Sequence, residues 1–134
     1  MRRDRRGSAT VEFAILFPLL ATLFLGVTDI TWFAYHRMAL GDSLWAGARM
    51  GAGTQDGEPE MIARDHAWSS WLDSGYGGQP DFTAQLTGIA PNQMLTLSAS
   101  ITLEPISGLI LKPITLDRSL TVRLENQLQA NPQL

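Results

Sequence analysis

One apolar run near the N-terminus constrains the fold of this chain more than any other feature. Phe13 to Tyr35 is 23 residues long and contains one formally charged residue, Asp29. A helix of about 20 apolar residues crosses the ~30 Å hydrocarbon layer of a bilayer. A buried core helix is the alternative, but the rest of the chain is too short to bury every side of such a helix. We therefore predict a transmembrane helix over residues 13–35.

Four arginines precede this run, and they predict its orientation. Positive charge beside a first membrane segment is kept in the cytoplasm, so the N-terminus stays inside and the remainder of the chain crosses the membrane. Trp32 and Tyr35 are then expected at the outer interface, where amphipathic rings are favoured. The residues that set this topology are Arg2, Arg3, Arg5 and Arg6.

A cleaved secretory signal has a similar basic start and apolar centre. Its apolar region is shorter, about 7–15 residues, and ends at a small-residue cleavage site. Here the nearest Ala-x-Ala sequence, at residues 46–48, lies well beyond the apolar run. The sequence therefore favours a retained membrane helix over a removed secretory signal.

Charge and cysteine content exclude several classes of function. After the first six residues the chain carries six basic and twelve acidic residues, which leaves no extended basic face for nucleic acid. The absence of cysteine excludes disulfides, thiolate metal sites and a cysteine nucleophile.

A short motif joins the basic leader to the apolar run. Gly7 is followed by four residues and then by Glu12, which opens the helix together with Phe13. Glycine lets a backbone extend into a protease cleft without a side-chain clash. A cut after Gly7 would place a new ammonium at Ser8, four residues from Glu12 and on the same helix face. The alternative is that Gly7 is linker and that Glu12 favours the positive end of a helix dipole.

The wider stretch resembles the TadE-like family of the Tad/Flp type IV pilus system. The resemblance covers roughly residues 5–53 and rests on the sequences Gly7-Ser8-Ala9-Thr10-Val11-Glu12-Phe13-Ala14, Pro18, and Ala46 to Ala52. It implies cleavage by a prepilin peptidase between Gly7 and Ser8. It also implies that Glu12 meets the N-terminal ammonium of a neighbouring subunit. The major Flp pilins usually have Tyr where this chain has Phe13, and they lack a domain of this size.

The resemblance therefore implies a minor pseudopilin needed for pilus assembly, with roles in adhesion or secretion. The implied partners are the prepilin peptidase, other Tad pseudopilins, the Flp major pilin and the assembly platform of the bacterial inner membrane. An uncleaved single-pass scaffold or binding module of the same machinery is the alternative. An exported enzyme with a signal anchor is a third possibility, which the lack of catalytic groups disfavours.

The remaining pattern predicts an α+β fold with three parts. These are a basic leader over residues 1–7, a long helix over 8–53 that Pro18 should bend, and a small extracytoplasmic domain over 54–134. Gly47 and Gly51 are expected to pack closely against the protein's own sheet. A second helix over residues 58–73 should use Met61, Trp68, Trp71 and Leu72 as its apolar side.

Three stretches of alternating apolar residues predict an antiparallel sheet of about three strands packed on the long helix. The first is short, the second is regular, and in the third Arg118 interrupts the apolar series. Their apolar positions are Phe82, Ala84 and Leu86; then Leu95, Leu97, Ala99, Ile101 and Leu103; then Ile114, Leu116, Leu120, Val122 and Leu124.

We predict no catalytic residue, cofactor or metal site. His36 and His66 are the only histidines; they have no zinc-ligand spacing and are expected at the surface. Asp56, Glu58 and Glu60 lack the fuller pattern of a calcium loop. Asp29 either reaches the interface or contacts another subunit, since an ionisable group in hydrocarbon needs a partner.

Overall fold

The computed structural model describes residues 6–54, 58–89, 92–109 and 111–125, and shows an α+β fold. A long helix precedes a short one, and a three-stranded sheet follows, so the predicted fold class is confirmed. The elements are α1 (Arg6–Ala52), α2 (Pro59–Asp73), β1 (Asp81–Thr87), β2 (Met94–Leu103) and β3 (Ile114–Arg123).

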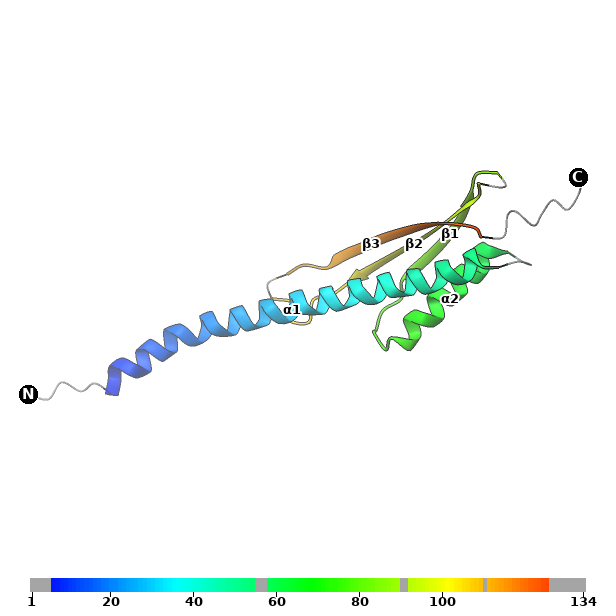
Figure 1. The fold of residues 1–134 in the computed structure, drawn as a ribbon. Helices are drawn as coiled ribbons and strands as arrows, with labels where there is room; N and C mark the ends of the chain where they lie inside the picture. Colours follow the sequence, from blue (N-terminus) through cyan, green and yellow to red (C-terminus); the bar gives the residue numbers. More distant parts are fainter. Residues whose placement is uncertain (1–5, 55–57, 90–91, 110, 126–134) are drawn as a thin grey trace, which may run out of the picture.

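Helix α1 runs the length of the molecule, but only its C-terminal half is covered (Figure 1). The sheet and α2 both pack on that half, while the N-terminal half projects alone. The helix continues through Pro18 without a break and curves gently in its N-terminal part (Figure 1). The hydroxyl of Thr22 donates to the carbonyl of Pro18 at 2.8 Å.

The sheet is antiparallel with the order β1-β2-β3. Leu97 at its centre pairs with Ala84 on one side and with Leu120 on the other. The alternation in β2 places one face against the helices, as predicted, and all five apolar residues of that face are at most 5% exposed. The opposite face is rich in hydroxyl groups, and Thr96 and Thr121 hydrogen-bond across strands at 2.9 Å.

Arg118 occupies an inward position of β3, opposite Ala99 of β2. Its guanidinium passes over Gly41 of α1, where a Cβ atom would collide with it. The long side chain thus covers the helix while the residue as a whole remains exposed, which is common for arginine at the rim of a core. The interruption in the apolar series therefore leaves the register unchanged.

Two glycines of α1 bring α2 unusually close. A Cβ at Gly47 would lie 2.8 Å from Cβ of Ala67 and 2.9 Å from Cδ2 of Leu97. A Cβ at Gly51 would lie 2.7 Å from both Cβ of Ala63 and Cδ2 of Leu95. The glycines therefore pack against α2 as well as against the predicted sheet.

This close approach decides which face of α2 is buried. Only small side chains fit between the helices, so Ala63 and Ala67 are buried together with Trp71. The prediction that Met61 and Leu72 belong to the apolar side was wrong, because they are 47% and 60% exposed.

Candidate membrane and assembly site

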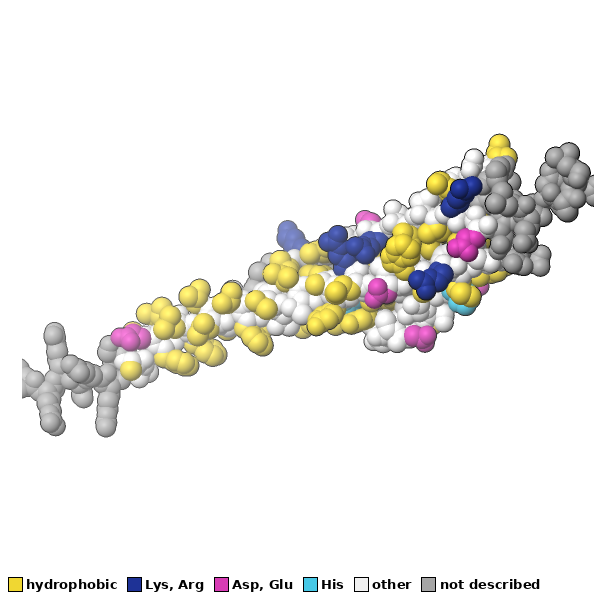
Figure 2. Space-filling model, in the orientation of Figure 1, with side chains coloured by type: hydrophobic (Ala, Val, Ile, Leu, Met, Phe, Trp, Pro, Cys, Tyr) yellow, Lys and Arg dark blue, Asp and Glu magenta, His cyan; other side chains and the backbone are white. Residues whose placement is uncertain are grey.

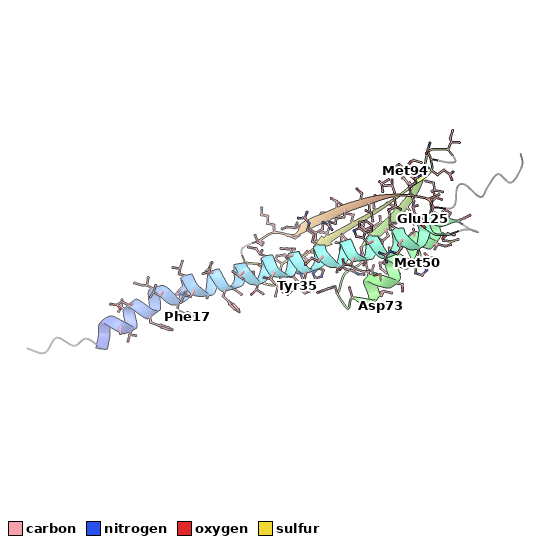
Figure 3. The ribbon with its side chains drawn as sticks, in the orientation of Figure 1. Phe17, Tyr35, Met50, Asp73, Met94 and Glu125 are labelled. Carbon is pink, nitrogen blue, oxygen red and sulfur yellow. The ribbon has the colours of Figure 1, made fainter. Side chains whose placement is uncertain are left out.

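The N-terminal half of α1 exposes apolar side chains in every direction. From Ala9 to Leu20 every residue is exposed, and from Ala9 onward Asp29 is the first buried residue of the helix. Figure 2 shows hydrophobic side chains along this half, whereas most charged ones lie over the domain. Phe17 projects from it with no other element beside it (Figure 3). We call Ala9–Thr28 the free half and Asp29–Ala52 the packed half.

By length and composition, α1 is able to cross a membrane, and its free half has twenty residues. Twenty residues at 1.5 Å per residue give about 30 Å, which equals the ~30 Å hydrocarbon thickness of a bilayer. A core helix of a soluble protein would have its apolar side chains covered, and here they are open. The long apolar helix thus fits a single-pass membrane protein.

The predicted cleavage site lies at the start of α1. Arg2, Arg3 and Arg5 lie outside the described residues, and the backbone from Arg6 onward is helical. The peptide bond between Gly7 and Ser8 therefore lies in the first helical turn. The first turn of a helix has backbone N–H groups without intrahelical partners and frays readily. A peptidase that binds an extended chain would have to unwind this one turn.

Glu12 and Phe13 lie near the N-terminal end of the free half. Both are exposed, Phe13 at 64%, and the ring of Phe13 lies 5.7 Å from that of Phe17, one turn further on. Glu12 is one helical turn from Ser8, so the carboxylate and the predicted new ammonium share a face. The structure thus brings these predicted residues onto one short segment at the tip of the helix.

Asp29 marks the boundary between the two halves. Its carboxylate accepts hydrogen bonds from the backbone N–H of Ser107 at 2.9 Å and from its hydroxyl at 2.5 Å. Ser107 lies in the loop between β2 and β3, so the contact closes the domain onto the helix. The sequence predicted that Asp29 reaches the interface or contacts another subunit; the structure gives it a partner in its own chain, so its carboxylate needs no contact with another subunit. A partner within the same chain satisfies the carboxylate.

The packed half begins earlier than the C-terminal end of the predicted membrane segment. Phe33 is 8% exposed and belongs to the domain core, while Trp32 packs partly against that core. Tyr35 lies on the opposite side and is 52% exposed. In the last turns of the run 13–35, apolar side chains thus pack in or against the core of the domain.

His36 is buried, which corrects the expectation of a surface position. It is 0% exposed, and its ring lies 4.0 Å from Trp32, 6.0 Å from Trp71 and 5.0 Å from Tyr76 between ring centroids. Its Nδ1 hydrogen-bonds the carbonyl of Trp32 at 2.9 Å. Besides Trp32 of the same helix, it is enclosed by Trp71 of α2 and by Tyr76 of the loop after α2, which lie 35 and 40 residues away in the sequence. His66 is exposed, as expected.

Polar contacts also fix the sheet to α2. Oε1 of Glu60 accepts a hydrogen bond from the backbone N–H of Leu86 at 2.8 Å, so this acid has a structural partner. Across the described parts of the chain, no three His, Asp or Glu side chains are grouped so that they could hold a metal ion.

The comparison with known families concerns the same helix. Residues 7–49, about a third of the chain, match the family model described as TadE-like protein. This segment is similar to the TadE-like family. The match runs from the predicted cleavage glycine through the free half and most of the packed half, and it confirms the resemblance. No curated protein and no solved structure matches the chain.

The TadE-like segment indicates a Tad pilus-associated protein. The contacts that the sequence did not predict join this segment to residues far from it in the chain. Asp29 and Ser107 are separated by 78 residues, and no local pattern joins them. A charged residue within an apolar run was the only signal, and it indicated a partner without naming one.

Proposed function

We propose that this protein is a minor pseudopilin needed for assembly of Tad/Flp-type pili. It is held in the bacterial inner membrane by the free half of α1, with the N-terminus in the cytoplasm and the domain in the periplasm. The single observation that carries the proposal is the free half itself. An apolar helix that its own chain leaves open needs lipid around it, or the helices of neighbouring subunits.

The free half is the contact surface of the protein both in the membrane and during pilus assembly. In the membrane the free half is surrounded by lipid, and during assembly helices of other Tad pseudopilins or of the Flp major pilin replace that lipid. Phe13 at the tip of the free half takes part in these contacts. The inner-membrane assembly platform is the expected site of this exchange. The packed half stays within the domain throughout, because its contacts are within one chain.

Processing prepares the tip of the helix for assembly. Hydrolysis of the Gly7–Ser8 peptide bond by a prepilin peptidase removes the arginine-bearing leader and leaves an ammonium at Ser8. That ammonium of one subunit then pairs with Glu12 of its neighbour. The two groups are each unfavourable in hydrocarbon and compensate one another when paired. Removing the leader also removes four positive charges that would oppose withdrawal from the membrane.

The proposal is tested by the intact mass of the full-length protein, expressed with and without the matching prepilin peptidase. We expect loss of Met1–Gly7 only when the peptidase is present, and no loss in Gly7→Leu. A full-length mass in every sample would instead support the uncleaved scaffold.

Glu12→Gln separates processing from assembly in the same experiment. It should still be cut and inserted, but cross-linking to pilus partners and piliation should be lost, because a neutral amide cannot compensate an ammonium. Asp42→Gln is the matched control, since Asp42 is exposed on the packed half. Normal piliation of Glu12→Gln would contradict the role of the carboxylate.

A further inference from the structure

The loop between β2 and β3 is fixed to α1 at one point. Ser107 donates two hydrogen bonds to Asp29, and its hydroxyl oxygen accepts the N–H of Leu109 at 3.4 Å. Gly108 between them has a positive φ of 61°, which turns the chain at low steric cost. The loop is therefore held at the level of the helix where the free half ends.

The same loop exposes apolar side chains. Ile106 is 59% exposed and Leu109 is 77% exposed, and Lys112, three residues further along the chain than Leu109, is exposed too. Exposed apolar patches mark sites of contact with proteins or membranes, and Ile106 and Leu109 are three residues apart in one short loop. The bonds to Asp29 hold the backbone still while these side chains point away from the core.

The position of the loop relative to the free half indicates which partner its apolar side chains contact. It lies at the end of the sheet that faces the free half, whereas the turn between β1 and β2 lies at the far end (Figure 1). When the free half fills the ~30 Å hydrocarbon layer, Asp29 and Ser107 fall at the membrane surface. Ile106 and Leu109 then meet the interface, and Lys112 is within reach of lipid phosphates.

We propose that this loop rests on the lipid surface on the domain's side of the membrane, with Ile106 and Leu109 inserted at the level of the headgroups. Apolar side chains gain free energy there, and a neighbouring lysine adds attraction to phosphate. Together with the helix, the loop gives the domain a second contact with the bilayer. The domain would thus be held in one orientation before assembly. The inference rests on the membrane span of the proposed function.

The chain contains no cysteine, so a single introduced cysteine can carry an environment-sensitive fluorophore. We would label Leu109→Cys, Phe17→Cys and Ile89→Cys in the full-length protein. The vesicles would contain phosphatidylcholine and phosphatidylglycerol whose acyl chains are brominated near the headgroup, to probe Leu109, or near the chain end, to probe Phe17; Ile89 would be measured in both. Phe17 reports on the free half. Ile89 is the matched control, because it is an aliphatic loop residue with 84% exposure at the far end of the sheet.

We expect lipid quenching at Leu109 and Phe17 to be several-fold stronger than at Ile89. Quenching at Phe17 with Leu109 behaving like Ile89 would overturn the loop contact and leave the membrane span intact. Absence of quenching at Phe17 would overturn the span, and the loop contact with it. A Leu109 label shielded only at high protein density, without lipid quenching, would show that a second copy covers the loop, and would overturn the proposal.

Discussion

The two halves of α1 differ in which side chains they expose and which they bury. The free half exposes its apolar side chains, whereas the packed half buries three polar residues, namely Asp29, His36 and Ser43. Each of them makes at least one hydrogen bond: Ser43 donates to the carbonyl of Ala39 at 2.9 Å, and His36 uses Nδ1, while its Nε2 is buried without a partner. One helix is therefore built for two surroundings. Amino-acid composition alone does not distinguish the two halves. They differ in whether other elements of the same chain pack against the helix.

The largest expected effect is a loss of stability in the packed half and the domain around it. Trp71 of α2 is 0% exposed and its ring lies beside those of His36 and Tyr76, so Trp71→Ala should lower the free energy of unfolding of the domain by about 3–5 kcal/mol. Denaturant titration in detergent, followed by circular dichroism, measures this change. Leu72→Ala is the control, because Leu72 is 60% exposed and its loss should stay within about 0.5 kcal/mol. Equal effects would contradict the packing of α2.

A charge in the free half tests the other side of the comparison. Leu19 is 66% exposed near the middle of the free half, and Leu19→Arg should oppose membrane insertion by about 2.5–3.5 kcal/mol. Met38→Arg changes a side chain with 64% exposure on the packed half and should insert normally. The membrane-integrated fraction after alkaline extraction distinguishes them. Loss of insertion in both variants, or in neither, would remove the distinction between the halves.

A substitution with a smaller expected effect tests the close packing between the packed half and α2. Gly51→Ala places a Cβ 2.7 Å from Leu95 Cδ2 and 2.8 Å from the carbonyl oxygen of Pro59, so overpacking should cost about 1–3 kcal/mol. Gly53→Ala adds the same methyl group with its nearest contact at 3.5 Å and should be nearly neutral. Thermal unfolding of the two variants in detergent gives the comparison. A stability of Gly51→Ala equal to that of Gly53→Ala would show that α2 can move away.

The sequence predicted those parts of the fold whose signal is local. The alternation in β2 sets which face is buried whatever lies against it, and the cluster around Gly51 sets where α1 ends. Burial in α2 was not predictable in the same way, because the closeness allowed by Gly47 and Gly51 excludes Met61 from the contact. For the candidate site, Gly7, Ser8 and Glu12 follow from a motif within a few residues. Asp29 depends on Ser107, which only the folded chain brings near.

The end of the membrane span is where sequence and structure lead to different expectations. The apolar run predicts a span that continues to Tyr35, whereas the structure begins domain packing at Asp29. In the packed half the apolar residues on one side belong to the core, and those on the other side face outward. Tyr35 and Met38 are of the second kind, and both are more than half exposed.

The most direct test of the two-surroundings account is a cysteine scan of α1 in intact membrane vesicles, read with a membrane-impermeant maleimide. Positions on all faces of Ala9–Thr28 should resist labelling until detergent is added. Tyr35→Cys and Met38→Cys should label from the domain's side without detergent. Labelling of Phe17→Cys in intact vesicles, or protection that extends through Met38→Cys, would contradict the account.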